Sequence, residues 1–326
     1  MRENQNTIEV ALILQPNAQL SVVYGLIDLF KIAQFCNEKL EADLSTTVRI
    51  THWDIAKNGK TFECVFDSQP DSSKASPDFL VIPPTLNQII SSSDAVIWTD
   101  WIKRQHEEGA IICSVCTGAF LLAETGLLNG RKATTHWFQA NSFQDKFPAV
   151  RVDTNKLVID EGDIVTAGGI TAWVDLGLHL TERIFGKAAM LKTAQFMNVD
   201  PTGRDQQNYN RFSPKLAHGD ENILIVQHWL RKHYIDKTSI SDMAEKAGLG
   251  ERNFIRRFQH VTRLTPTQYL QKLRINQAKD LLELTKKNIE QISWEVGYDD
   301  VASFRKVFHK HSGLTPGEYR TKFWVA

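Results

Sequence analysis

The chain has 326 residues and a formal net charge of zero, because 38 lysine and arginine residues balance 38 aspartate and glutamate residues. This length suggests about two domains, each able to bury a core. With 42% hydrophobic and 23% charged residues the chain is neither disordered nor fibrous, and zero net charge argues, for the chain as a whole, against a strongly basic nucleic-acid-binding protein.

Neither membrane insertion nor secretion is expected. The uncharged, largely apolar run at residues 110–123 is shorter than the roughly 18–20 residues that a bilayer requires. Residues 1–14 lack the long apolar region and the small-residue cleavage site of a signal peptide. The cysteines do not suggest a secreted disulfide framework; they are Cys36, Cys64, Cys113 and Cys116. We therefore expect a cytoplasmic protein.

In the first 205 residues, short β-rich runs alternate with amphipathic stretches, which predicts an α/β domain with a mostly parallel sheet. Strands are predicted at residues 8–14, 48–55, 79–82 and 110–115, and a hairpin at 156–159 and 163–165. Helices are predicted at residues 22–35, 94–108 and 175–185. The expected architecture is a flavodoxin-like sandwich, whose ligands bind outside the carboxyl ends of the strands.

One predicted strand ends in residues that could take part in catalysis or ligand binding. An apolar strand enters a helix through Cys116, Thr117 and Gly118, which is the pattern of a nucleophile elbow. A helix N-terminus lowers the pKa of a thiol, and its free N–H groups can hold an oxyanion or a carboxylate. Residues 133–137 predict a short strand that ends in His136 and returns beside the cysteine. A nearby Cys and His are the minimum for nucleophilic catalysis; the alternative is a buried structural cysteine and a structural histidine.

Residues 116–137, CTGAFLLAETGLLNGRKATTHW, resemble the ThiJ/PfpI-like branch of the class I glutamine amidotransferase-like fold. The resemblance extends over about residues 7–200 and includes the TAGGI stretch at 166–170. It implies a pocket at the elbow, with Cys116 and His136 as the candidate catalytic pair. The candidate ligand-binding residues are Cys116, Thr117, Gly118, His136, Trp137, Tyr24 and Gly169. The aromatic rings of Trp137 and Tyr24 are candidates for contact with a cation.

The chain departs from that branch in two places. Enzymes of this kind commonly place a carboxylate from the first helix beside the cysteine, whereas the first acid here is Asp28, one or two turns late. The loop after the third strand, commonly Gly-Gly, is Pro83-Pro84. These departures favour a pocket that binds a ligand without turning it over.

Residues 203–219 are polar, are punctuated by glycine and proline, and predict a linker. We accordingly predict a ligand-sensing domain at 1–205, a linker at 206–218 and a second domain at 219–326. Residues 1–205 hold 18 basic and 25 acidic residues, so 18 − 25 = −7, and the remainder holds 20 − 13 = +7. This asymmetry suggests different partners for the two parts, the alternative being solvated surfaces that merely differ.

The second domain contains an internal repeat. Leu264-Thr265-Pro266 recurs fifty residues later as Leu314-Thr315-Pro316, and Phe254 and Phe258 recur as Phe304 and Phe308. Each copy has a helix, a glycine turn (Gly248 or Gly297) and a second helix with basic residues, which is the helix-turn-helix pattern. A helix from Pro266 to about Leu284 connects the copies. The fold class is therefore α/β followed by an all-α domain, with a plain helical bundle as the alternative.

This second domain closely resembles the AraC-type DNA-binding domain. The residues that carry the resemblance are Gly297, Tyr298, Asp300, Phe304, Phe308, Gly313, Thr315, Pro316, Tyr319 and Arg320. In that family both second helices approach the major groove. The candidate DNA-binding residues are Arg252, Asn253, Ile255, Arg256, Gln259, Ala302, Arg305 and Lys306. We call the second helix of each copy its reader helix. Because Asp299 and Asp300 repel phosphate at the start of the second reader helix, we expect that copy to contribute less base readout.

The two resemblances together imply a GlxA-type AraC-family regulator: a ligand-responsive, sequence-specific DNA-binding transcription regulator. In that subgroup the effectors are often amino acids or quaternary-ammonium compounds. The alternatives are a Cys-dependent hydrolase or glyoxalase-like enzyme that uses Cys116 and His136, and an oxidation sensor at Cys116. The expected partners are double-stranded DNA, a small-molecule effector and a second copy of the chain, with RNA polymerase as a candidate. We expect no cofactor and no metal.

Overall fold

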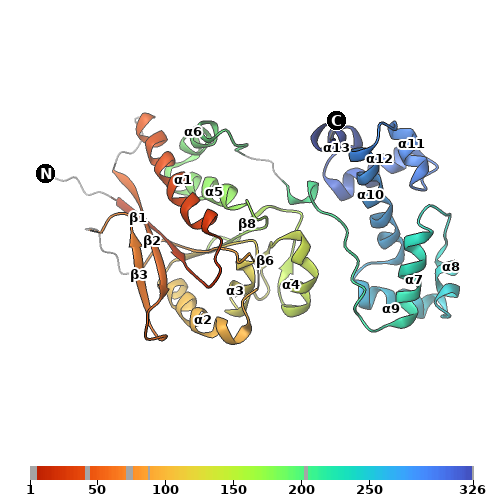
Figure 1. Ribbon diagram of the computed structural model, residues 1–326, viewed down its shortest axis with the longest axis horizontal. Coiled ribbons are helices and arrows are strands. Elements are labelled where there is room, and N and C mark those ends of the chain that lie inside the picture. Colours follow the sequence, from red (N-terminus) through yellow and green to blue (C-terminus); the bar gives the residue numbers. More distant parts are fainter. Residues whose placement is uncertain (1–5, 41–44, 71–75, 87–88, 202–204, 325–326) are drawn as a thin grey trace. The chain divides into compact units, whose positions relative to one another are not determined.

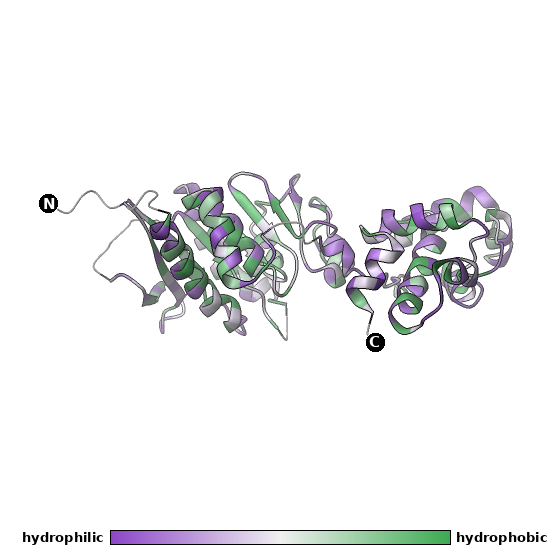
Figure 2. Cartoon of the chain, turned by 90° about the horizontal axis from the view of Figure 1, so that it is seen from above, coloured by the Kyte–Doolittle hydropathy of each residue, from purple (hydrophilic) through white to green (hydrophobic). Residues whose placement is uncertain are grey.

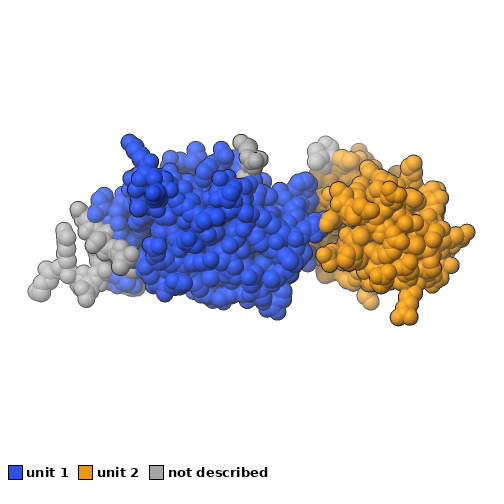
Figure 3. Space-filling model, turned by 90° about the horizontal axis from the view of Figure 1, so that it is seen from below, with its two compact units in different colours: residues 1–206 blue, residues 207–326 orange. Residues whose placement is uncertain are grey.

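The computed structural model describes residues 6–40, 45–70, 76–86, 89–201 and 205–324. The chain forms two compact units, residues 1–206 and 207–326, which are coloured separately in Figure 3. The first unit is α/β and the second is all-α, so the predicted fold class is confirmed. Residues 206–218 hold only a short 3-10 helix, η2 (Gln206–Asn208), and otherwise lack regular secondary structure.

Among the residues that the structure describes, a seven-stranded sheet forms the centre of the first unit. Its strands are β1 (Asn6–Ile13), β2 (Thr46–Ile55), β3 (Phe62–Asp67), β4 (Phe79–Ile82), β5 (Ile111–Val115), β8 (Val158–Asp160) and β9 (Ile164–Ala167). Their order is β3-β2-β1-β4-β5-β9-β8, with β3 and β8 antiparallel at the two edges. The five parallel strands have the order 2-1-3-4-5 of a flavodoxin-like sandwich.

Helices cover both faces of this sheet, which explains why the central strands are apolar at consecutive positions. On one face lie α1 (Leu20–Lys39) and α5 (Trp173–Phe185), with α6 (Lys187–Met197) packed against them. On the other lie α2 (Ser92–Glu107), α3 (Gly118–Glu124) and α4 (Ala140–Lys146). Figure 1 shows the two helical layers on either side of the strands. In Figure 2 hydrophobic residues gather on the strands, whereas the helices alternate hydrophobic and hydrophilic bands.

Helix α1 is the one helix of the described chain that is long and apolar enough to cross a membrane by length and composition. Half of its most apolar window is buried, and its buried residues, among them Leu26 and Phe30, belong to the core against the sheet. A buried core helix meets the same criterion, so this observation carries no argument for a membrane.

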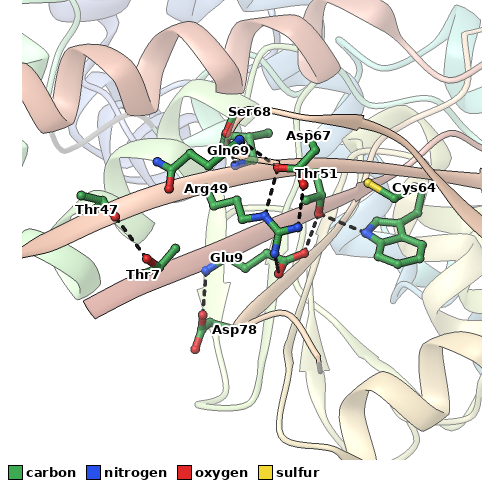
Figure 4. A network of polar contacts seen from close by, with 12 residues as sticks. Thr7, Glu9, Thr47, Arg49, Thr51, Cys64, Asp67, Ser68, Gln69 and Asp78 are labelled. Atoms are coloured by element: carbon green, nitrogen blue, oxygen red, sulfur yellow. Dashed lines mark hydrogen bonds and ion pairs between the residues drawn. The ribbon is translucent and has the colours of Figure 1, made fainter. Parts of the chain in front are cut away.

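An ion network holds edge strand β3, which sequence analysis missed, to the sheet (Figure 4). The guanidinium of Arg49 donates to both carboxylate oxygens of Asp67, at 3.0 and 2.6 Å, and to Glu9 Oε2 at 3.0 Å. The hydroxyl of Thr51 donates to Glu9 Oε1 at 2.7 Å. Because Glu9 is only 2% exposed, its carboxylate takes its hydrogen bonds from these donors rather than from water.

The second unit consists of helices α7 (Glu221–Lys232), α8 (Ile240–Lys246), α9 (Glu251–Thr262), α10 (Pro266–Leu284), α11 (Ile289–Glu295), α12 (Val301–Ser312) and α13 (Pro316–Phe323). Helices α8–α9 and α11–α12 form the two predicted helix–turn–helix copies, with Gly248 and Gly297 at positive φ in the turns. Each copy has its own core: Phe254 and Phe258 are buried in one, Phe304 and Phe308 in the other.

Helix α10 belongs to both of these cores. Its N-terminal half contributes Tyr269 and Leu270 to the first, and its C-terminal half contributes Ile275, Ala278 and Leu282 to the second. Its nineteen residues span about 28 Å at 1.5 Å per residue. The helix spans the residues that the sequence predicts. Its start is fixed because Thr265 caps it and Pro266 occupies its first turn.

Candidate functional site

The strand–turn–helix geometry predicted at the elbow is present. Cys116 follows β5 with a φ of +53°, in the left-handed region, and its N–H donates to Ala167 O at 2.6 Å. Helix α3 begins two residues later at Gly118. A Cβ atom on Gly118 would lie 2.4 Å from the carbonyl oxygen of Ile82, so only glycine fits where the turn crosses the end of β4.

The Cys116 side chain is buried, with 3% of the residue exposed. Burial raises the pKa of its thiol to about 11, against a hydrogen bond from the backbone of Thr117 that lowers it. The prediction of a lowered thiol pKa at this helix start is therefore wrong, because desolvation of the anion outweighs the helix N-terminus. Cys113 is fully buried inside β5, and burial raises its thiol pKa as well.

The loop that carries His136 lies against the elbow, as predicted, but not as a strand. Strand β6 (Lys132–Ala133) ends at Ala133, and the hydroxyl of Thr135 donates to Cys116 O at 2.8 Å. The predicted strand to His136 is wrong, because the Thr134 N–H donates to the Thr166 hydroxyl and the Thr135 hydroxyl donates to Cys116 O, and neither bond belongs to a backbone ladder between strands.

The His136 ring acts on its own loop. Its Nδ1 accepts the Phe138 N–H at 3.2 Å and so caps the short helix η1 (Trp137–Gln139). Burial lowers the pKa of this imidazole. Among the hydrogen bonds of the described residues, none joins the His136 ring to the Cys116 thiol. The elbow and the loop of His136 are therefore joined through the Thr135 hydroxyl, without a described hydrogen bond between the Cys116 thiol and the His136 ring.

Gln206 is a site residue that sequence analysis missed. It is 2% exposed, and its Oε1 accepts the Trp137 N–H at 2.9 Å. Its Nε2 donates to the carbonyl oxygens of Thr135 and Thr154, each at 3.0 Å. A Cβ atom on Gly168 would lie 2.4 Å from that Nε2, which explains the first glycine of the TAGGI stretch. Nothing local marks Gln206, because it stands 69 residues after Trp137 in a polar segment.

The remaining predicted ligand residues are spread more widely. Trp137 is half-buried, with its ring centroid 5.4 Å from that of His136. Tyr24 is 57% exposed on α1, and its ring packs edge-on against His52 at 6.2 Å. Gly169 faces Leu157 and Ala172 rather than the elbow.

Two buried glutamines lie at the end of β1 and the start of α1, beside the loop that follows β4. Gln15 donates from Nε2 to Pro83 O at 2.6 Å, and the N–H of Gln19 donates to Pro84 O at 2.8 Å. Both residues are buried, and both Oε1 atoms lack a hydrogen-bond partner among the described residues. Thr117 joins the same strand ends, since the Thr85 N–H donates to its hydroxyl at 3.0 Å. These acceptors suit a ligand with N–H groups.

No group of three or more metal-ligating side chains occurs among the described residues.

The two second helices of the all-α unit present their polar residues to solvent. On α9, Arg252, Asn253, Arg256 and Gln259 are exposed, and Ile255 is half-buried; on α12, Ala302, Arg305 and Lys306 are exposed. The Arg256 guanidinium donates to Asn253 Oδ1 at 2.9 Å, one turn away on the same face. The neighbouring Arg257 instead forms a paired contact with Asp220 and belongs to the scaffold.

Asp300 has a structural role at the start of α12. Its carboxylate accepts the N–H groups of Ala302 and Ser303 at 3.2 and 2.8 Å, and these bonds hold its pKa below the usual value. Asp299 pairs with Lys237 at 2.8 Å on the exposed surface. Asp300 therefore caps the helix, and Asp299 forms an exposed ion pair.

Arg274, in the middle of α10, fixes the two helix–turn–helix copies to each other. Its guanidinium donates to the carbonyl oxygens of Tyr234 and Asp236, at 2.7 and 2.9 Å, in the loop that precedes α8. The same group lies 5.4 Å from the ring centroid of Tyr298, after the turn of the second copy. A Cβ atom on Gly297 would lie 2.5 Å from Ile235 O, so this approach requires glycine.

Known families match each unit of the chain. The DJ-1/PfpI family matches residues 29–183, and a helix-turn-helix domain matches residues 243–322. Each match lies within one compact unit.

Curated relatives match parts of the chain or most of it. The HTH-type transcriptional regulator CdhR of Pseudomonas aeruginosa is 27% identical over 222 residues, which cover 68% of this chain and 66% of CdhR. The HTH-type transcriptional regulator GlxA of Rhizobium meliloti is 25% identical over 238 residues, covering 69% and 72%. Isonitrile hydratase of Pseudomonas putida is 35% identical over 119 residues, covering 36% and 49%. The chain thus spans just under two thirds of CdhR and about half of the hydratase.

Proposed function

Because this chain joins a domain of the DJ-1/PfpI family to an AraC-type helix-turn-helix domain, we propose that it is a DNA-binding transcription regulator whose first domain senses a small molecule. The observation that carries the proposal is the pair of exposed, polar second helices. Helices α9 and α12 bury their phenylalanines and turn Arg256 and Arg305 to solvent. Exposed arginines on such helices can reach base edges in the major groove.

The proposal is tested by replacing Arg256 on the exposed face of α9. Duplexes selected by the full chain from a random pool serve as the DNA, and affinity is measured by gel shift. The Arg256→Ala variant is expected to lose about 1–3 kcal/mol of binding free energy, or roughly five- to 150-fold in Kd. Lys187→Ala, which removes an exposed positive charge from α6 in the first unit, is the control and is expected to bind normally.

The two readers are expected to contribute unequally. Asp299 and Asp300 place two negative charges at the start of α12, whereas α9 begins with the single acid Glu251. Arg305→Ala should therefore weaken binding less than Arg256→Ala does. Equal losses in the two variants would contradict this ranking.

For the effector we propose a compound with a primary amine, with an amino acid favoured over a quaternary-ammonium compound. The Oε1 atoms of Gln15 and Gln19 support this choice, because a quaternary nitrogen has no N–H to give them. The ring of Trp137 is the surface we propose for the positive charge. Thermal-shift measurements on the full chain with amino acids and betaines test the choice, since a ligand that binds the folded state raises its Tm. A betaine that shifts the Tm more than any amine would refute it.

An alternative function is a Cys-dependent hydrolase or glyoxalase-like activity at Cys116 and His136. The similarity to isonitrile hydratase over 119 residues favours it. The raised pKa of the Cys116 thiol and the absence of a described thiol–imidazole hydrogen bond weigh against it. Turnover by purified protein that disappears in Cys116→Ser would establish the enzyme. Ligand binding that survives in that variant, without turnover, would favour the sensor.

The proposed partners are duplex DNA, the effector and a second copy of this chain, since regulators of this kind commonly read two half-sites. RNA polymerase is a further candidate. Light scattering of the purified full chain gives its mass in solution, and the proposal expects twice the chain mass of 37.1 kDa.

A further inference from the structure

The side chain of Gln206 has an unusually complete set of partners for a residue at the end of a unit. Its amide makes three hydrogen bonds of 2.9–3.0 Å to the backbone, and its Nε2 lies 3.5 Å from the Thr134 hydroxyl. The residue is 2% exposed, so water does not provide alternative partners. A buried, fully bonded amide has one position, and leaving it costs its hydrogen bonds.

These partners bracket the candidate ligand residue His136. The carbonyl of Thr135 precedes His136, the N–H of Trp137 follows it, and the Gln206 amide binds both. The hydroxyl of Thr135 in turn donates to the carbonyl oxygen of Cys116 at 2.8 Å. A ligand that shifts either Cys116 or His136 therefore changes the backbone groups that hold Gln206.

The next residue along the chain, Gln207, is bonded within the other unit. Its Nε2 donates to Lys310 O at 2.6 Å, at the end of reader helix α12. Three residues later, the ammonium of Lys279 on α10 donates to Asn210 O at 2.8 Å. Arg211 then pairs with Asp280 and Glu283 of α10 at 2.7 and 2.5 Å. Successive residues of the chain are thus held by the elbow loop and by the helices that carry the DNA readers.

We propose that Gln206 is the positioning residue through which ligand occupancy at the elbow and DNA binding by α9 and α12 influence each other. The inference rests on the proposed regulatory function. Gln206 itself touches neither DNA nor the thiol; it acts through the Thr135–Trp137 backbone. A ligand that favours one arrangement of this loop favours one anchoring of the segment that begins at Gln206, and the second unit is attached to that segment.

Coupling between two sites is reciprocal, which allows a test without knowing the effector. If a ligand at the elbow changes the affinity of the readers for DNA, then DNA on the readers must change the affinity of the elbow for that ligand by the same factor. We expect this shift to alter the exposure of Cys116. The probe is a duplex selected by the full chain from a random pool. The readout is the rate at which N-ethylmaleimide alkylates Cys116, followed by mass spectrometry, with the exposed Cys64 of β3 as an internal reference.

In the wild-type chain, saturating duplex should change the Cys116 rate about fivefold or more, the lower end of ordinary coupling between sites. In Gln206→Leu the change should fall below about twofold while the duplex still binds. Gln144→Leu is the matched control, since Gln144 also donates from its amide to a carbonyl of the first unit, that of Val150, and does not bond the elbow loop. This control should keep the wild-type response. Hydrogen exchange of the peptide containing the Trp137 amide provides a second readout.

A structural role alone would lower the Tm of Gln206→Leu and leave the response to DNA intact, and that result would overturn the proposal. The proposal also fails if the wild-type chain binds duplex without any change at Cys116 or Trp137. Should Gln206→Leu not fold, Thr135→Val removes the hydroxyl that bonds Cys116 and should abolish the response in the same way. If no duplex is selected, the proposed function itself fails, and this inference fails with it.

Discussion

Lowering the pH from 7.5 to 5 is expected to destabilise the first unit through one buried imidazole, that of His52. The residue is 3% exposed on β2, and its Nε2 has no hydrogen-bond partner among the described residues. Its ring lies against Phe66 and Tyr24, at centroid distances of 4.5 and 6.2 Å. Burial in these surroundings lowers the pKa of His52 to about 4 from an ordinary value of 6.5.

The sign of the effect follows from proton binding. Between pH 6.5 and 4 the unfolded chain holds a proton on His52 that the folded chain does not, so the free energy of unfolding falls as the pH falls. With pKa values of about 4 folded and 6.5 unfolded, the loss is about 2 kcal/mol at pH 5. Below pH 4 it approaches about 3 kcal/mol, at about 1.36 kcal/mol per pKa unit.

The assay compares chemical unfolding of the wild-type chain and His52→Phe at pH 7.5 and pH 5. The phenylalanine keeps an aromatic ring against Phe66 and cannot take up a proton. Each transition is assigned to a unit by hydrogen exchange, and the transition of the second unit, which does not contain residue 52, is the internal control. If the first unit loses the same stability in both proteins between the two pH values, the desolvation of His52 is not the cause.

Three further predictions concern the scaffold. Arg49→Met leaves the buried Glu9 carboxylate without its cationic partner and should destabilise the first unit by about 3–5 kcal/mol in denaturant titrations. Thr265→Ala removes the cap of α10 and should cost about 1 kcal/mol, whereas Thr265→Ser should cost only a fraction of that. Burial lowers the pKa of Lys279 to about 8, so the unfolded chain binds more protons above that pH and the second unit should become more stable from pH 8 to 10.5. Lys279→Met should flatten that rise, and an unchanged slope would contradict the assignment.

The second unit could be predicted from the sequence almost completely, because its signals are local. Thr265 and Thr315 each precede a proline and accept the N–H of a residue three positions later, so the caps of α10 and α13 are encoded within four residues. The buried phenylalanines recur at helical spacing in both copies. The central strands of the first unit were equally clear, because strands covered on both faces are apolar at every position.

Edge strand β3 could not be predicted in the same way. Its residues Phe62–Asp67 are largely exposed and carry no apolar run, and they are a strand because Arg49 and the ladder of β2 hold them. The short strand predicted to end at His136 failed for a related reason: Thr134 and Thr135 bond to groups far away in the sequence. A pattern of hydrophobicity does not contain such partners.

Some properties of the elbow likewise follow from the sequence, and others only from the tertiary structure. Sequence alone determined that Cys116 stands between a strand and a helix, because glycine and apolar residues mark that turn. Only the tertiary structure decided the protonation of the thiol, since burial by surrounding segments raises its pKa against the helix N-terminus. It also decided the role of Gln206, whose partners lie 52 to 72 residues away. Turns and caps depend on neighbours within a few residues, whereas burial and long-range hydrogen bonds exist only after the chain has folded.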